Sequence, residues 1–159
     1  HVLTHTLHYG SGVFETVGAE HPRIARNYHH VDAATIYLVT DPARYDVIVT
    51  DNLFGDILTD LAGAVTGGIG LAASANLNPA RTGPSMFEPV HGAAHDIAGT
   101  GTANPCAAIR SAALMLEHLG EAEAARRVAD AVLAQQREMA GDDQPWKTAS
   151  IGDAVARRL

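Results

Sequence analysis

Two aspartates spaced four residues apart are the clearest sign of chemistry in this sequence. Asp56 and Asp60 lie in residues 51–60, which read DNLFGDILTD. On a helix, residues four apart project from the same face, so the two carboxylates would lie one turn apart. Two like charges there destabilise each other unless a cation lies between them, and hard oxygen ligands suit Mg²⁺ or Mn²⁺. An ordinary surface helix with both carboxylates in water is the alternative that this spacing leaves open.

A strand followed by a helix is expected to position these aspartates. Residues 45–50 are rich in β-branched side chains and predict a short strand. Asp51 and Asn52 are residue types that close strands and cap helices. The following apolar residues recur at helical spacing and predict a helix from Asn52 onward: Leu53, Ile57, Leu58, Leu61, Ala62 and Val65.

A second stretch with possible chemistry lies between residues 88 and 105. It is rich in Gly and Ala, with His, Asp and Asn spaced along it, so a ligand could lie close to its backbone. Asp96 could accept hydrogen bonds from the hydroxyls of a ribose, and its charge would repel a 2′-phosphate. A long ordered turn without a ligand is the alternative.

The other elements serve mainly to pack the chain. We expect a strand over residues 1–9 ended by Gly10 and Gly12, another over 24–31, and a third over 86–92. Asp32 is expected to cap a helix over 33–39. Further helices are predicted from Asn104-Pro105 to Leu119, over 121–139 and over 151–159, with 78–85 and 141–145 as loops. The first of these three helices presents an apolar face of Ala108, Ala112, Met115, Leu116 and Leu119.

Composition narrows the class of protein. The chain has 159 residues, 47% apolar, which is enough for a core. A net charge of −7 without any basic run argues against a nucleic-acid or membrane-surface partner. The single cysteine, Cys106, cannot form an internal disulfide, and no apolar run approaches the roughly 20 residues that span a bilayer. Residues 1–20 lack a signal-peptide pattern, so a cytoplasmic location is expected.

Taken together, residues 31–33, 50–60 and 87–105 resemble the isocitrate/isopropylmalate dehydrogenase family, whose members are metal-dependent β-decarboxylating dehydrogenases. The resemblance covers about residues 19–159 and is strongest to the isopropylmalate branch, which serves leucine biosynthesis. It implies an α/β protein, the C-terminal half of an isopropylmalate dehydrogenase-like two-domain fold. Residues 1–66 would then belong to the dimer-interface and metal-binding domain, and residues 67–159 to the NAD-binding domain.

The resemblance also implies the residues of the site. Asp56 and Asp60 match the family's carboxylates for Mg²⁺ or Mn²⁺, and Asp32 matches a carboxylate that reaches the metal site of the partner in a homodimer. The matches to the adenosine-binding loop are Glu88, His91, Gly92, Ala93, Ala94, Asp96, Ile97 and Asn104. Asp96 followed by Ile97 is the pair of the NAD-using members. The implied chemistry is oxidation of a 2-hydroxy dicarboxylate by NAD⁺, followed by loss of CO₂.

Two departures limit what this chain is expected to do alone. The family's cofactor loop usually reads G-[ST]-A-P-D, whereas residues 92–96 read GAAHD, so cofactor affinity is expected to be weaker. The family's substrate-binding arginines, catalytic Tyr and catalytic Lys have no counterpart here, and the only lysine is Lys147. We therefore assign no catalytic residue and expect this chain to be inactive by itself.

Other readings stay open at this point. A related dehydrogenase acting on isocitrate, tartrate or malate, or a non-catalytic binding or assembly remnant, fits the same motifs. Residues 3–15 also resemble the N-terminal segment of the pyridoxal phosphate-dependent branched-chain aminotransferases. That family's Schiff-base lysine is missing, so the activity does not follow, but a junction between two genes is possible.

Overall fold

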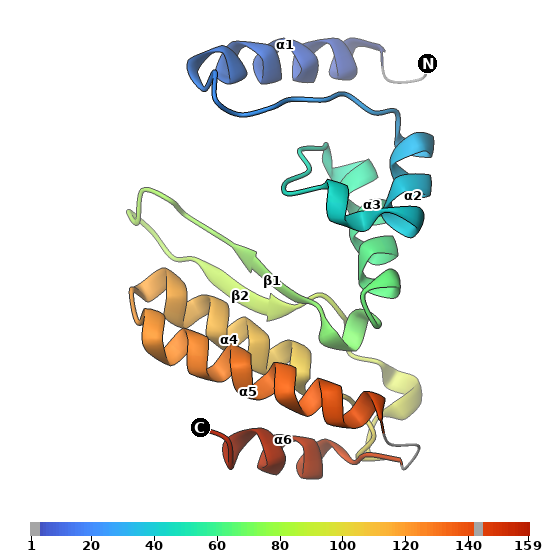
Figure 1. The fold of residues 1–159 in the computed structure, drawn as a ribbon, viewed down its shortest axis with the longest axis vertical. Coiled ribbons are helices and arrows are strands. Elements are labelled where there is room, and N and C mark those ends of the chain that lie inside the picture. The colour runs from blue at the N-terminus through green and yellow to red at the C-terminus, as the bar shows by residue number, and fades with distance from the viewer. Residues whose placement is uncertain (1–3, 142–144) are drawn as a thin grey trace. The chain divides into compact units, whose positions relative to one another are not determined.

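A computed structural model describes residues 4–141 and 145–159, with side chains from residue 9 onward (Figure 1). The chain divides into two compact units, His1–Ala62 and Gly63–Leu159, each with its own core. Among the described residues, no helix is long and apolar enough to cross a membrane.

The first unit is helical. It contains α1 (Thr4–Glu20), α2 (Val31–Thr40), the single 3-10 turn Pro42–Arg44 and most of α3 (Asn52–Val65). Its core is small: Ala34 and Leu38 of α2 are buried with Leu58 of α3. Partly buried neighbours are packed against this cluster, namely Val31, Tyr45, Leu61 and Ala62.

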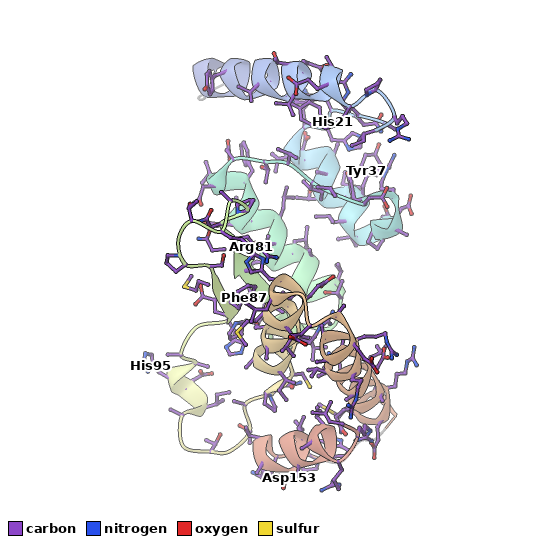
Figure 2. The ribbon with its side chains drawn as sticks, turned by 90° about the vertical axis from the view of Figure 1, so that its left-hand side faces the viewer. His21, Tyr37, Arg81, Phe87, His95 and Asp153 are labelled. Carbon is purple, nitrogen blue, oxygen red and sulfur yellow. The ribbon has the colours of Figure 1, made fainter. Side chains whose placement is uncertain are left out.

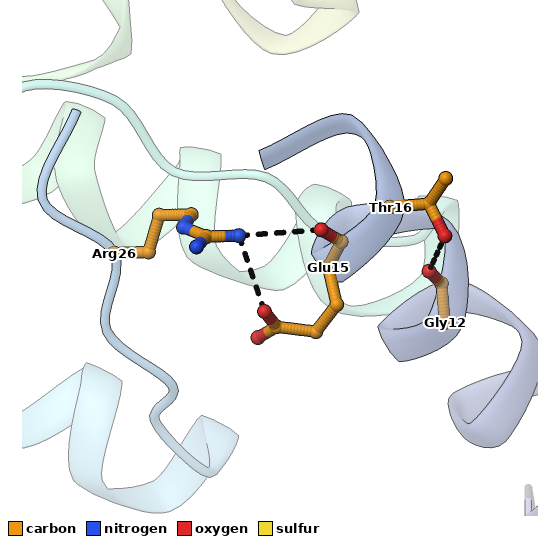
Figure 3. Close-up of polar contacts among 4 residues, drawn as sticks. All are labelled: Gly12, Glu15, Thr16 and Arg26. Atoms are coloured by element: carbon orange, nitrogen blue, oxygen red, sulfur yellow. Dashed lines mark hydrogen bonds and ion pairs between the residues drawn. The ribbon is translucent and has the colours of Figure 1, made fainter. Parts of the chain in front are cut away.

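The strand predicted over residues 1–9 is wrong for the described residues, because residues 4–20 form one helix. The pattern that was missed is the spacing of Tyr9, Val13 and Val17, which are four residues apart and so lie on one helix face. Gly10 and Gly12 do not interrupt it. Figure 3 shows the Thr16 hydroxyl donating to the Gly12 carbonyl at 2.8 Å within this helix. Residues 1–3 lie outside the described part of the chain.

An ion pair joins α1 to the segment that follows it. Arg26 Nη1 lies 3.1 Å from Glu15 Oε2 and also donates to the Glu15 carbonyl at 3.3 Å (Figure 3). Both partners are partly or largely exposed, so the pair contributes little to stability.

The strands predicted over 24–31 and 45–50 are not formed as ladders. Within the described residues the paired strands are β1 (Ala73–Asn76) and β2 (Met86–Pro89) alone. Residues 25–30 and 47–50 belong to no helix, turn or sheet. The reason is that a strand needs a partner for its backbone groups, and composition alone does not supply one.

The residues that cap the N-terminal ends of α3 and α2 can be compared with the caps predicted from the sequence. For α3 the prediction is confirmed: the Asp51 carboxylate accepts a hydrogen bond from the Phe54 amide at 3.0 Å. For α2 it is corrected, because His30 takes the N-cap position and Asp32 lies inside the first turn. Its carboxylate accepts from the adjacent Ala33 amide at 2.7 Å. The negative charge at that helix start remains favourable.

In the second unit, β1 and β2 are antiparallel, with Ala75 opposite Phe87. The sequence predicted β2 but not β1, whose Ala, Ser and Asn residues carry little strand propensity. Helix α4 (Cys106–Leu119) packs against both strands, and the Phe87 ring lies 5.6 Å from the ring of His118 on α4. Figure 2 labels Phe87 on β2.

Three helices complete this unit. They are α4, α5 (Ala122–Ala140) and α6 (Thr148–Ala156), and all three were predicted within a few residues of these bounds. Their buried cluster is Cys106, Ala131, Val132, Ile151 and Val155, with Leu71, Ile109, Met139 and Trp146 packed against it.

The apolar face predicted for α4 is only partly the buried one. Met115 and Leu119 are 39% and 61% exposed, and Ala108 is exposed as well. The buried positions are instead Cys106, Ala107, Ser111 and Ala113. These buried side chains are all small, so apolar periodicity alone did not identify the buried face of α4.

Candidate functional site

The two aspartates of α3 stand on one exposed face of that helix. Asp56 and Asp60 are separated by one turn, and both are exposed to solvent. Asp56 Oδ2 accepts a hydrogen bond from Asn52 Nδ2 at 3.1 Å, which holds that carboxylate toward the N-terminal turn. The buried side of the same helix is anchored by Leu58. The helix therefore presents two hard oxygen ligands together, in a donor set that suits a divalent cation.

The third predicted ligand is not gathered with them. Among the described residues, no group of three or more His, Cys, Asp or Glu side chains is placed to hold a metal ion. Asp32, which the prediction assigns to the metal site of the partner subunit, lies in the first turn of α2, where its carboxylate accepts a hydrogen bond from the Ala33 amide. Asp56 and Asp60 supply at most part of a coordination shell, so further ligands must come from water, substrate or another chain.

The loop after β2 turns sharply and is shaped by residues in left-handed conformations. Ala94 has φ 46° and leads into the 3-10 turn His95–Ile97, and Gly99 and Gly101 have φ 76° and 66°. Such conformations favour glycine, which makes Ala94 the strained position of the loop. Figure 2 labels His95 on this exposed turn.

The predicted cofactor-binding residues follow one another along this loop. Glu88 is exposed on β2, opposite Ser74 of β1. The His91 ring contacts the Gly92 carbonyl through Nδ1 at 3.0 Å, which orients the ring. Ala93, Ala94 and Asp96 are exposed, while Ile97 is half-buried. A nucleotide would thus meet an accessible backbone and the exposed carboxylates of Glu88 and Asp96.

Asn104 lies at the far end of the loop and has a structural role. Its Oδ1 accepts a hydrogen bond from the Cys106 amide at 2.9 Å, at the start of α4. Pro105 takes the N-cap position, so the proline precedes the first helical residue and does not occupy it. Asn104 therefore connects the end of the candidate cofactor loop to the first turn of α4.

Hydrogen bonds from Thr148 and Thr100, which the sequence did not predict, hold the candidate cofactor loop in place. The Thr148 amide donates to the Gly101 carbonyl at 2.9 Å, and the Thr148 hydroxyl donates to the Ala103 carbonyl at 2.5 Å. Within the loop, the Thr100 hydroxyl donates to the Ile97 carbonyl at 2.7 Å. Contacts across some 45 residues have no local sequence signal, so only the fold reveals them.

The chain belongs to the isocitrate/isopropylmalate dehydrogenase family, whose family model matches residues 1–155. The matched range includes residues 3–15, the segment that also resembles the aminotransferases. This segment is therefore part of the match to the dehydrogenase family. An α/β fold of this kind was expected from the motifs and is confirmed.

Curated relatives bear the name 3-isopropylmalate dehydrogenase. That of Corynebacterium jeikeium is 65% identical over 91% of this chain and 42% of its own length. That of Beutenbergia cavernae is 60% identical over 99% of this chain and 45% of its own length. The chain thus spans somewhat less than half the length of these relatives.

Solved structures show the same fold. The crystal structure of isocitrate dehydrogenase from Methylococcus capsulatus is similar over 99% of this chain and 47% of the length of that enzyme. The TM-score is 0.91 and the sequence identity is 41%. A β-decarboxylating dehydrogenase from Thermococcus kodakarensis matches 99% of this chain with a TM-score of 0.78 and 35% identity. The chain therefore corresponds to about half of such an enzyme.

Proposed function

We propose that this chain carries the divalent-cation and NAD-binding elements of an enzyme that oxidises and decarboxylates 3-isopropylmalate in leucine biosynthesis. The observation that carries the proposal is the pair of exposed carboxylates, Asp56 and Asp60, one turn apart on α3. The names of relatives up to 65% identical support the choice of substrate.

Each site residue has a distinct role in this proposal. Asp56 and Asp60 hold Mg²⁺ or Mn²⁺, and Asp32 reaches the site of the partner subunit in a homodimer. Asp96 accepts hydrogen bonds from the ribose hydroxyls of NAD, while Glu88, His91 and Asn104 frame the adenosine. When bound, the cation supplies Lewis-acid stabilisation of the carbonyl and enolate oxygens, and NAD⁺ accepts the hydride.

Turnover of the substrate requires catalytic groups in addition to the metal-binding and NAD-binding residues named above. In this proposal the site residues of this chain bind and orient the ligands, and we assign none of them the removal of the proton from the substrate hydroxyl. We therefore propose that the chain by itself binds ligands without turning over substrate. An isocitrate-oxidising enzyme is the second candidate, favoured by the 0.91 TM-score to an isocitrate dehydrogenase, although that structure is only 41% identical.

Ligand-dependent thermal stabilisation tests the proposal. A ligand that binds only the folded chain, at about 100 times its Kd, stabilises it by about 2.7 kcal/mol and raises Tm by several degrees. We expect Mg²⁺ to raise Tm in the natural chain but not in Asp56→Asn, which keeps an oxygen for Asn52 but loses the charge. NAD⁺ is expected to raise Tm in the natural chain but not in Asp96→Ala.

A matched control makes the result specific. Asp153 is an exposed aspartate on α6 that belongs to neither motif, so Asp153→Asn should keep both ligand shifts (Figure 2). NADP⁺ should stabilise the natural chain less than NAD⁺ does, because Asp96 repels the 2′-phosphate. If a folded natural chain shows no shift with either ligand, the chain is a non-catalytic remnant and the proposal fails.

A further inference from the structure

A small pocket lies in the second unit, between the connection from β1 to β2 and the C-terminal end of α4. It encloses about 330 Å³, which is at the lower end of the range for pockets that bind small molecules. Arg81 on the connection and Phe87 on β2 both line it (Figure 2). Its lining shares no residue with the predicted metal-binding and cofactor-binding sets. The proposed function therefore leaves this pocket without a role.

The Arg81 side chain is held at the pocket by the end of α4. Its Nη2 donates to the carbonyl of His118, one of the last-turn carbonyls that have no partner within the helix. Arg81 also has φ 55°, a left-handed conformation that is uncommon for a residue with a Cβ. Such backbone strain is found most often at functional sites. The helix end and the strained backbone thus place a guanidinium at the pocket.

The charge of Arg81 is not balanced by an acidic side chain. In the part of the chain that the structure describes, no carboxylate forms an ion pair with Arg81, and none lines the pocket. A guanidinium has five N–H donors, of which the His118 carbonyl takes one. Its planar arrangement of donors matches the two oxygens of a carboxylate. The pocket therefore has a cation with donors available for an anionic ligand.

Ser85 and His118 add further polar atoms to the lining. Ser85 Oγ accepts a hydrogen bond from the Asn78 amide at 2.9 Å and lies 3.5 Å from His118 Nε2. Because the hydroxyl accepts from that amide, its own proton is available to donate to His118 or to a ligand. Ser85 is thus a second donor beside Arg81.

The rest of the lining is largely apolar. The Phe87 ring lies 5.6 Å from the ring of His118, and the side chains of Met115 and Leu119 line the pocket from α4. Both α4 side chains are exposed to solvent, so an apolar group that covered them would be stabilised by their burial. The pocket combines apolar surface with a few polar groups, as ligand sites do.

We propose that this pocket binds a small monocarboxylate with a compact apolar body, such as one aromatic ring. Arg81 receives the carboxylate, Ser85 donates to it, and the apolar side chains pack against the body of the ligand. This binding does not require the metal or NAD, so it is independent of the proposed function.

Phenylacetate is the probe for this site, because it joins a carboxylate to one aromatic ring. We expect it to bind the whole chain with a Kd of about 1 mM or below in isothermal titration calorimetry. In NMR spectra of the natural chain, the amide shifts should change at residues 81–87 and 115–119.

Two analogues separate the contributions of the charge and the ring. Phenylacetamide has nearly the same shape without the charge, so it should bind about tenfold or more weakly than phenylacetate. Acetate keeps the charge but has no ring to bury, so a similar loss is expected. Together they test whether both parts of the pocket take part in binding.

Arginine variants test the assignment of the carboxylate partner. Arg81→Gln removes the charge and should weaken phenylacetate binding about tenfold or more, whereas phenylacetamide binding should change less. Arg81→Lys keeps the charge without the planar donors, so its affinity should be intermediate. Arg127→Gln is the matched control, because Arg127 is an exposed arginine of α5 that does not line the pocket. This control should bind phenylacetate as the natural chain does.

Four results would overturn the proposal. The first is the absence of phenylacetate binding, and the second is equal affinity for phenylacetamide. The third is a set of shift changes outside residues 81–87 and 115–119. The fourth is equal affinity for acetate and phenylacetate, which would indicate an adventitious ion only. Because the shifts of the natural chain locate the site directly, an Arg81→Gln variant that fails to fold does not leave the question undecided.

Discussion

At the scale of single residues, Cys106 combines complete burial with a titratable group. It begins α4 within the core of the second unit. Burial raises the pKa of its thiol, because the thiolate would lose its hydration, and the nearby Arg110 guanidinium opposes this shift. The thiol thus behaves as a small apolar side chain and stays protonated in the folded protein at neutral pH.

This shift predicts a loss of stability at alkaline pH. A folded-state pKa above the unfolded value favours the folded state below the unfolded pKa, and that contribution is lost as pH rises through the folded pKa. From neutral pH to about pH 10, the free energy of unfolding of the natural chain should fall more steeply than that of Cys106→Ala. Urea titrations at several pH values measure this, and parallel curves for the two proteins would contradict it.

At the scale of elements, α4 ends as its sequence predicts. Gly120 caps the helix with φ 92°, and its amide donates to carbonyls of the last turn, those of Leu116 and Glu117. A residue with a Cβ is strained in that left-handed region, whereas glycine is not. The stop is therefore set by backbone conformation and does not need a packing contact.

A pair of glycine substitutions tests this cap. Gly120→Ala should destabilise the chain by about 1 kcal/mol, because alanine is strained at that φ. Gly152→Ala is the matched control, since Gly152 lies inside α6 with open space where its Cβ would be and without a positive φ. It should be neutral or stabilising by up to about 1 kcal/mol. Urea unfolding measures the change in the free energy of unfolding for both variants. Equal changes would show that the positive φ of Gly120 does not determine the cost of adding a Cβ.

At the scale of the molecule, each unit depends on a small core. The second unit buries Ile151 and Val155 of α6 against Val132 of α5 and Cys106 of α4. The Arg158 guanidinium donates to the Gln135 side-chain oxygen at 2.9 Å and pairs with Glu138, which joins α6 to α5 at its surface side. The apolar contacts supply most of the stability, because the ion pair is partly exposed.

Truncation of the core should therefore be costly. Ile151→Ala removes a side chain that is 2% exposed and should destabilise the chain by about 2–4 kcal/mol, since it leaves a cavity among the three helices. Ile36→Ala makes the same change on α2, where Ile36 is 60% exposed, and should cost less than about 0.5 kcal/mol. Denaturant unfolding monitored by circular dichroism measures both, and similar losses would argue against this core.

Local patterns in the sequence were sufficient for features set by near neighbours. The helix of the aspartates, its Asp51 cap, strand β2 and the Gly120 stop all rest on interactions within a few residues. The side-by-side placement of Asp56 and Asp60 follows from helix periodicity alone. The family membership likewise came from long contiguous motifs, and the family match confirms it.

Features that depend on distant partners were decided only by the tertiary structure. Strand β1 exists because β2 pairs with it, although its own residues do not favour a strand. The stretch 45–50 has strong strand propensity yet stays unpaired, because pairing requires a partner that these residues do not supply. The buried face of α4 and the bonds from Thr148 to the cofactor loop were decided in the same way. Periodicity identifies what one segment can do, whereas packing and long-range hydrogen bonds decide which partner it meets.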